Sequence, residues 1–503
     1  MERKWTREQK AAIDTHGANL LVAAAAGSGK TAVLVERVIR MVTREENPVD
    51  LDRILIVTFT RAAASEMKER IQKAIEEQIT ALTSGTDAGT HSAALANLKR
   101  QAALLPHSFI MTIDSFCAYV VRNYCHTLDM DPDFRVGDQG ELTLLQADVM
   151  EQLLEEQYQE GREEFLRFVE CYGGARDDQA MEKYISRLYH FSQSDPWPQE
   201  WLDRCEQSLD AGEGKELDDL PWIQCVIRDA RWFGAEAKIC LEQGLELCYE
   251  EDGPWMYEEM FRSDLETVGQ ILAASSYEEM YQLFSRMKFV RRPSKKDGTV
   301  SEEKKNLAAQ LRDQGKKTLQ DLKKQYFIQP PQEIQEGLEL MREPVSVLIS
   351  LAREFGARYA LAKAEKNILD FNDLEHCALN ILLSREGEET VRQEAARELS
   401  GYFEEIMIDE YQDSSLLQEY ILNSISREWE GQPNQFMVGD VKQSIYSFRM
   451  ARPELFIGKY QAYSRLGEEG QEKTEVPVGT GGQEDGRRKK CGLRIDLSAN
   501  FPR

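Results

Sequence analysis

The stretch NLLVAAAAGSGKTAVLVERV, residues 19–38, joins an apolar run to a glycine-bearing turn and then to a helix-like pattern. The usual phosphate-binding loop has Gly, four residues, and then Gly-Lys-Ser/Thr. Ala24 occupies the first of those positions, but Gly27 and Gly29 keep the backbone freedom of the loop itself. We interpret this stretch as a strand, a phosphate loop and a helix. A tight strand-to-helix turn without a ligand is the alternative.

In this interpretation, backbone N–H groups and the N-terminus of the helix hold the phosphates. Lys30 reaches the β- and γ-phosphates, and Thr31 binds Mg²⁺. The candidate ATP-binding residues of the loop are Ala24, Ala25, Ala26, Gly27, Ser28, Gly29, Lys30 and Thr31.

Short apolar runs predict the fold class. They occupy residues 19–24, 54–59, 108–113, 405–410 and 435–440, with helical patterns between them such as 61–79. The runs are continuous rather than alternating, which is typical of strands buried on both faces of a parallel sheet. We therefore expect a doubly wound α/β fold, in which ligands bind at the carboxyl ends of the strands.

The predicted sheet is interrupted by a long helical segment. We expect a motor lobe from residues 1–130 and 365–464, and a mostly helical inserted domain over 131–364. Residues 465–492 are polar and Gly-rich, as expected of a flexible linker, and a further strand candidate follows at 493–498.

Charge is distributed unevenly along the 503 residues, whose net charge is −26. Residues 131–290 hold 14 Lys and Arg against 37 Asp and Glu, whereas residues 291–324 hold 11 against 5. The second segment could contact DNA through Lys295, Lys296, Lys304 and Lys305. A solvated helix face is the alternative, and it is the usual meaning of a charge run.

Two classes of protein are disfavoured by composition. No apolar run is long enough to span a membrane, and the nine cysteines include no Cys-x-x-Cys pair. We expect no membrane partner and a reducing, cytoplasmic location.

A second set of candidate catalytic residues lies in EIMIDEYQDSS, residues 405–415. An apolar strand delivers Asp409 and Glu410 at its carboxyl end. Asp409 can bind Mg²⁺, and Glu410 can orient and deprotonate an attacking water. A charged strand end with a helix cap is the alternative.

The segment FMVGDVKQSIYSFRMARPELF, residues 436–456, supplies the remaining candidates. Gln443 follows a strand end and could sense the γ-phosphate. Tyr446, Phe448 and Arg449 suit stacking on unpaired bases. Taken alone, Tyr446 or Phe448 is more often a core residue than a DNA contact, and that is the alternative.

These blocks, in this order, resemble superfamily 1A DNA helicases of the UvrD/Rep type. WTREQKAAI (5–13) is similar to the adenine-reading motif of that family, with Gln9 as the reader. VTFTRAAASEMKERI (57–71) and TIDSFC (112–117) are similar to two of its DNA-contacting blocks. The resemblance implies a RecA-like lobe, use of ATP and Mg²⁺, and contacts to single-stranded DNA from Thr58, Phe59, Thr60, Thr112 and Ser115.

Within that group, TIDSFCAYVVRNYC (112–125) and LDFNDLEHCAL (369–379) resemble the AddA family of bacterial helicase–nucleases. Asp373 is a candidate helix cap in the second segment. The resemblance implies 3′→5′ movement on single-stranded DNA during double-strand-break repair, contact with duplex DNA, and an AddB-like partner. The alternatives are a UvrD-like helicase without a nuclease and a DNA-binding module without turnover.

The resemblance also shows departures. The family continues Asn-Phe-Arg-Ser-Arg where this chain has Asn500-Phe501-Pro502-Arg503, so Pro502 replaces a phosphate-contacting arginine. We expect residues 465–503 to be a linker and the start of a truncated second lobe. Without that lobe and a nuclease domain, the chain is expected to show little ATP hydrolysis or unwinding and no nuclease activity.

Overall fold

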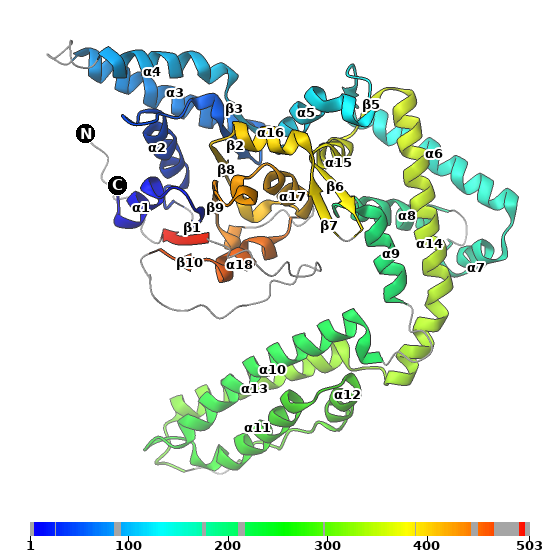
Figure 1. Cartoon of the computed structure of the whole chain (residues 1–503). Helices are drawn as coiled ribbons and strands as arrows, with labels where there is room; N and C mark the ends of the chain where they lie inside the picture. The colour runs from blue at the N-terminus through cyan, green and yellow to red at the C-terminus, as the bar shows by residue number, and fades with distance from the viewer. Residues whose placement is uncertain are drawn as a thin grey trace. The chain divides into compact units, whose positions relative to one another are not determined.

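The computed structural model describes residues 5–25, 27–84, 92–173, 178–209, 217–294, 297–387, 389–443, 451–466 and 492–497 (Figure 1). Contacts divide the chain into two compact units. Unit 1 comprises Met1–Gln152, Tyr189–Pro198 and Phe355–Arg503, and unit 2 comprises Leu153–Leu188 and Gln199–Glu354.

A seven-stranded sheet organises the described residues of unit 1. The strand order is β10-β11-β1-β9-β8-β2-β3, and every pairing in it is parallel. The strands are β1 (Asn19–Ala24), β2 (Ile54–Thr58), β3 (Phe109–Thr112), β8 (Glu405–Ile408), β9 (Gln435–Gly439), β10 (Ser464–Arg465) and β11 (Gly492–Leu497).

Both faces of the sheet are buried, because successive side chains of a strand point to opposite faces. Leu20 and Ile54 belong to one apolar cluster, whereas their neighbours Leu21 and Leu55 belong to the other. This double burial explains the continuous apolar runs and confirms the expected α/β fold with a parallel sheet.

Two sets of helices cover the two faces. The cluster containing Leu20 includes side chains of α1 (Arg7–Asp14), α2 (Lys30–Val42), α3 (Arg61–Ser84) and α4 (Ser92–Leu104). The cluster containing Leu21 includes side chains of α5 (Ile113–Tyr124), α15 (Phe371–Leu382), α16 (Glu394–Tyr402), α17 (Leu416–Ser424) and α18 (Pro453–Ala462).

Unit 2 is helical in its described residues and has a core of its own. Phe327 stacks on Tyr277 and Phe284, with ring centroids 5.2 and 4.5 Å apart, and Arg312 forms a buried ion pair with Asp264. Its helices are α7 (Glu163–Tyr172), α9 (Pro198–Ser208), α10 (Pro221–Cys248), α11 (Glu258–Ala273), α12 (Tyr277–Arg286) and α13 (Glu302–Tyr326). Three more helices run across the division between the units: α6 (Gln139–Glu160), α8 (Gln179–Ser192) and α14 (Pro331–Glu365). The first residue of α9, Pro198, also belongs to unit 1.

Parts of the segment that we expected to form the inserted domain belong to the same unit as the sheet. Residues 131–152, 189–198 and 355–364 belong to unit 1. One reason is that β4 (Arg135–Val136) pairs in parallel with β5 (Ile368–Leu369). Another is that the Trp197 ring packs edge-on against Tyr420 of α17, at 4.9 Å.

The strand after residue 465 corrects an expectation. Instead of opening a second lobe, β11 pairs along its whole length with β1, from Asn19–Gly492 to Ala24–Leu497. Tyr463 packs so closely on Gly492 that an added Cβ would lie 2.3 Å from the ring. The strand therefore belongs to the first sheet.

The cap of α15 lies at a different residue from the expected one, and one hairpin was not foreseen. Asp370, not Asp373, is the N-cap of α15, and Asp373 completes a capping box by accepting from the Asp370 N–H at 2.8 Å. A hairpin of β6 (Leu383–Glu386) and β7 (Glu389–Arg392) follows that helix.

Candidate functional site

The phosphate loop follows β1 directly. Ser28 N–H donates to the Ala25 carbonyl at 3.1 Å, and Gly27 and Gly29 have φ values of 76° and 86°. These left-handed angles suit glycine, so both glycines are needed to make the turn. Gly29 is the N-cap of α2, which makes Lys30 its first residue and Thr31 its second. Of the candidate loop residues, Ala26 lies outside the described part of the chain.

Ser28 offers a direct indication of a ligand in this loop. Its side chain is buried, and its Oγ finds no hydrogen-bond partner among the described residues. A buried hydroxyl left unpaired costs free energy, of the order of 1–3 kcal/mol. An oxygen-rich ligand such as a phosphate would satisfy it.

The acidic pair lies at the same edge of the sheet. Asp409 and Glu410 follow the last residue of β8, and Lys30 Nζ lies 3.0 Å from Glu410 Oε2. Glu410 has a φ of 52°, which is rare for a non-glycine residue and is typical of functional sites. The structure thus brings together Lys30 and Glu410, which the sequence predicts to share one site.

Asp409 has an unusual environment. Burial and the neighbouring Glu410 carboxylate raise the pKa of Asp409 to about 6, against the lowering effect of Lys30. A carboxylate in such a position favours a nearby cation, because a positive charge offsets both the burial and the repulsion.

Gln443 lies just after β9, near a third strand end. Its Nε2 donates to Asp440 Oδ2 at 2.6 Å, and its backbone N–H donates to the Asp440 carbonyl at 2.9 Å. Asp440 immediately follows the last residue of β9, which lies between β1 and β8. Gln443 therefore follows a strand whose neighbours carry the loop and the acids.

Gln9 contacts the phosphate loop. It is buried, its Oε1 accepts from the Thr6 N–H at 3.0 Å, and its Nε2 donates to the Ser28 carbonyl at 2.9 Å. The first bond belongs to the capping box of α1. The predicted adenine reader therefore links the start of α1 to the loop.

The candidate DNA-contacting residues that the structure describes lie where β2 and β3 end. Thr58 is buried and donates to the Thr60 carbonyl at 3.0 Å, while Thr60 Oγ1 accepts from the Ala63 N–H at the start of α3. Thr112 caps α5, and its hydroxyl lies 2.9 Å from that of Ser115. Tyr446, Phe448 and Arg449 lie outside the described residues.

A small hollow, of about 20 Å³, connects this strand end with the acidic pair. Its lining comes from β2, β8, the turns that follow these strands, and helices α5 and α17: Val57, Thr58, Phe59, Ile113, Ile408, Asp409, Glu410, Asp413, Ser414, Gln418 and Leu422. Two candidate DNA-contacting residues, Thr58 and Phe59, thus lie next to the candidate catalytic acids.

Gln412 belongs to the site, although the sequence did not single it out. Its buried Nε2 donates to Glu410 Oε2 at 2.9 Å and to Asp413 Oδ2 at 3.1 Å. Its Oε1 accepts from the Asp440 N–H at 2.9 Å. The available signal was its place in IDEYQDS, two residues after Glu410.

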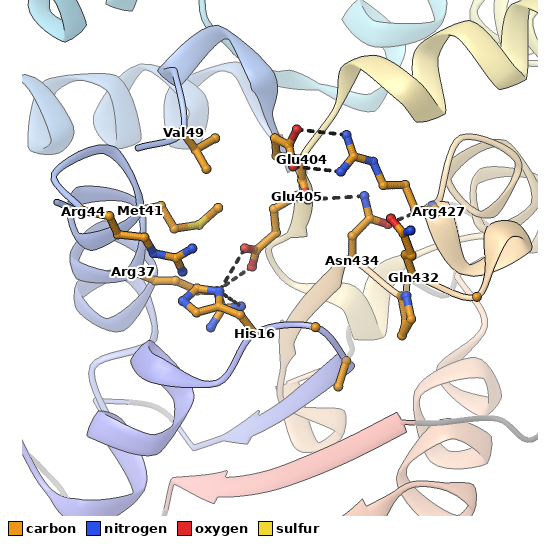
Figure 2. A pocket seen from close by; sticks show the side chains of 14 residues that line it. His16, Arg37, Met41, Arg44, Val49, Glu404, Glu405, Arg427, Gln432 and Asn434 are labelled. Carbon is orange, nitrogen blue, oxygen red and sulfur yellow. Dashed lines mark hydrogen bonds and ion pairs between the residues drawn. The ribbon is translucent and has the colours of Figure 1, made fainter. Parts of the chain in front are cut away.

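A larger pocket, of about 420 Å³, lies at the other edge of the sheet, where β8 begins (Figure 2). Four of its charged side chains form two ion pairs. Arg37 Nε donates to Glu405 Oε1 at 2.5 Å, and Arg427 holds both carboxylate oxygens of Glu404, at 2.8 and 3.0 Å. These pairs stabilise the start of β8. The phosphate loop lies at the opposite ends of the strands, so we do not assign the nucleotide to this pocket.

Two negative findings concern the described residues alone. No helix among them is both long and apolar enough to cross a membrane. They contain no cluster of three or more His, Cys, Asp or Glu side chains arranged to bind a metal ion.

The chain is similar to known proteins over almost all of its length. It is 44% identical over 502 residues to an ATP-dependent helicase/nuclease subunit of Lachnoclostridium phytofermentans, and 40% identical over 503 residues to the protein of the same name from Geobacillus kaustophilus. Each alignment covers 99% of this chain but only 34% and 38% of the relative, so the chain spans about a third of the length of these relatives.

A family model describes the same region. The UvrD/REP helicase N-terminal domain matches residues 5–464, which include the phosphate loop, the acidic pair and Gln443. Because this match extends over most of the chain, the chain belongs to the UvrD/REP helicase family.

Proposed function

We propose that this chain is the ATP-binding motor part of a DNA helicase that moves 3′→5′ along single-stranded DNA. The observation that carries the proposal is the 3.0 Å contact between Lys30 of the phosphate loop and Glu410 at the end of β8. Membership of the UvrD/REP helicase family supports DNA as the track.

The residues present suit ATP with Mg²⁺. The loop has an unpaired buried hydroxyl at Ser28 and two left-handed glycines, and Lys30 supplies a positive charge. Thr31 and Asp409 would hold Mg²⁺, which neutralises charge on the phosphates when it is bound. Gln9 would read the adenine, for which it would exchange one of its present hydrogen-bond partners.

The catalytic roles are assigned by position. Glu410 would orient the attacking water and accept its proton, since its carboxylate lies beside the lysine that binds the phosphates. Gln443 would respond to the γ-phosphate from the end of β9. Glu410 must exchange Lys30 for water in this process, so nucleotide binding has to separate the observed ion pair.

The proposed DNA path crosses the ends of β2 and β3. Thr58, Phe59, Thr60, Thr112 and Ser115 would contact the strand, with Tyr446, Phe448 and Arg449 from the segment after Gln443. The hollow shared by Thr58, Phe59, Asp409 and Glu410 supports this placement, because it puts DNA contacts beside the hydrolysis residues.

The larger assembly is also part of the proposal. The relatives are named as subunits of an ATP-dependent helicase/nuclease, which favours a helicase–nuclease of DNA-break repair with an AddB-like partner over a UvrD-like helicase without a nuclease. A bacterial protein acting on chromosomal DNA would work in the cytoplasm. A module that binds ATP and DNA without turnover is the second candidate, and measurement of ATP hydrolysis separates it from the first.

Three measurements test the proposal in order, the first two of them on this chain. Equilibrium binding of a fluorescent ATP analogue, with and without Mg²⁺, tests the nucleotide site. ATP hydrolysis with and without single-stranded DNA separates a motor from a module without turnover. Little movement is expected of this chain by itself, so displacement of a 3′- or 5′-placed block from single-stranded DNA tests polarity in a longer protein that contains the chain. Absence of ATP binding by the chain would overturn the proposal.

A further inference from the structure

Gln412 uses both ends of its side-chain amide, and the direction of that amide is determined by its neighbours. The Asp440 N–H can only donate, so the Gln412 atom that faces it must be the oxygen. The nitrogen then faces the carboxylates of Glu410 and Asp413, which can accept. The reverse orientation would place an amide N–H₂ against a backbone donor.

A hydrogen-bonded chain therefore crosses the site from one strand end to the other. It runs from Lys30 Nζ to Glu410 Oε2, from Glu410 to Gln412, from Gln412 to the Asp440 N–H, and from Asp440 Oδ2 to Gln443 Nε2. The last three donor–acceptor distances of this chain, from Glu410 to Gln443, lie between 2.6 and 2.9 Å.

The packing around Gln412 leaves its amide little freedom. Its side chain is 1% exposed. An added Cβ at Gly439 would lie 2.4 Å from Gln412 Oε1 and 3.2 Å from its backbone nitrogen. Glycine at position 439 thus permits the close approach of β9 to the turn that carries Glu410.

We propose that Gln412 is a positioning residue. It fixes the position of the Glu410 carboxylate relative to the end of β9, so that Gln443 and Glu410 move together. This inference rests on the proposed function for the role of Glu410, but the contact it describes exists without nucleotide. A shift of the segment after β9, for example on DNA binding, would reach Glu410 through a single buried amide.

We call the hydrogen-bonded connection from Glu410 through Gln412 to Asp440 and Gln443 the relay. Hydrogen exchange of the Asp440 amide in the nucleotide-free protein tests it. In Gln412→Ala the amide loses its acceptor, and we expect its exchange to become at least tenfold faster. Gly439→Ala should do the same by displacing Gln412, and Glu410→Ala should speed exchange at least threefold by removing one anchor of the amide. Gln435→Ala is the matched control, because Gln435 is equally buried at the far end of β9, where it donates to Asn423.

Single-turnover ATP hydrolysis supplies the second measurement. Gln412→Ala and Gly439→Ala should lower the hydrolysis rate at least tenfold while ATP affinity stays within threefold, because neither change touches the phosphate loop. Unchanged Asp440 exchange in Gln412→Ala, or a loss of ATP affinity as large as the loss of rate, would overturn the relay. Failure of the proposed function appears separately, as ATP binding that does not depend on Lys30.

Discussion

Lys30 Nζ and Glu410 Oε2 lie 3.0 Å apart, although 380 positions separate the two residues in the chain. The pair joins the first residue of α2 to the turn after β8. Phosphate oxygens would compete with Glu410 for the same ammonium group. The nucleotide would thereby release the carboxylate for its role with water.

Replacing Lys30 tests the phosphate site. Lys30→Ala removes charge-assisted hydrogen bonds to phosphate, each worth about 1.5–3 kcal/mol, so ATP affinity should fall about ten- to hundredfold. Equilibrium titration with a fluorescent ATP analogue measures this. Lys10→Ala, which removes an exposed lysine of α1, is the control and should bind normally. Equal affinities of the two variants would show that Lys30 does not bind the nucleotide.

Asp409 predicts an unusual pH dependence of stability. Its pKa is raised to about 6 in the folded chain, above the value of 3.8 for an ordinary aspartate, so the folded state binds this proton more tightly than the unfolded state. The charged carboxylate therefore lowers the free energy of unfolding above pH 6, and this penalty is relieved as the pH falls from 6 towards 4. Asp409→Asn should be more stable than the parent at pH 7.5, by about 1–3 kcal/mol, and the advantage should vanish near pH 4.

Urea unfolding of both proteins across this pH range measures the difference. An advantage of Asp409→Asn that is the same at pH 7.5 and pH 4 would contradict the raised pKa. Saturating MgATP should reduce the advantage at neutral pH, because a bound cation offsets the charge of Asp409 and the asparagine variant would bind the metal less well.

The proposed role of Gln9 in reading adenine can be separated from its observed contact with the loop. If it reads adenine, Gln9→Ala should reduce the preference for ATP over GTP, because the amide supplies both a donor and an acceptor to the base edge. If it only supports the loop through Ser28, the affinities for ATP and GTP should fall together. Competition titrations with both nucleotides decide between these outcomes.

Among the described residues, Phe59 is a proposed DNA contact that can be tested. A base stacked on an aromatic ring is worth about 1–3 kcal/mol, so Phe59→Ala should weaken binding of single-stranded DNA by about one to two decades. Phe448→Ala is expected to behave in the same way. Fluorescence anisotropy with a labelled oligonucleotide measures the affinity. A lower melting temperature with unchanged DNA affinity would identify the ring as a core residue.

Two lysines of α13 allow the basic stretch to be tested. Lys304 Nζ lies 2.5 Å from Glu250 Oε2 and also pairs with Asp252, and Lys305 Nζ lies 2.7 Å from Glu302 Oε1. Because acids already balance these charges, replacing both lysines with alanine should leave the salt dependence of DNA affinity unchanged. A shallower slope would show that the lysines release counterions from DNA. Lys295 and Lys296 lie outside the described residues.

Local patterns predicted most of the sheet. The run at 19–24 coincides with β1, and the other expected strands differ from the observed ones by at most two residues at an end. Strands buried on both faces leave this signal because every position must be apolar. The hairpin β6–β7 gave no comparable signal, since its strands are four residues each and largely polar.

Long-range pairing was beyond the reach of the sequence patterns. Nothing in residues 493–498 indicates that they pair with β1 rather than starting another sheet, because the pattern of a strand does not specify its neighbour. The relay through Gln412 was missed for the same reason, as one of its partners, Asp440, lies on a different strand end. Asp370 and Asp373 show the opposite case, in which a local motif was recognised and its two aspartates were exchanged.

The position of β1 has a consequence for biosynthesis. Its two neighbours in the sheet, β9 and β11, are made only when translation has passed residues 439 and 497, whereas β2 and β3 can pair soon after they emerge. The apolar core of unit 2, built from residues 217–338, is complete on the ribosome well before that. Until β9 has been made, both edges of β1 lack a partner strand. A nascent chain with such open edges is exposed to wrong strand pairing and would benefit from a chaperone.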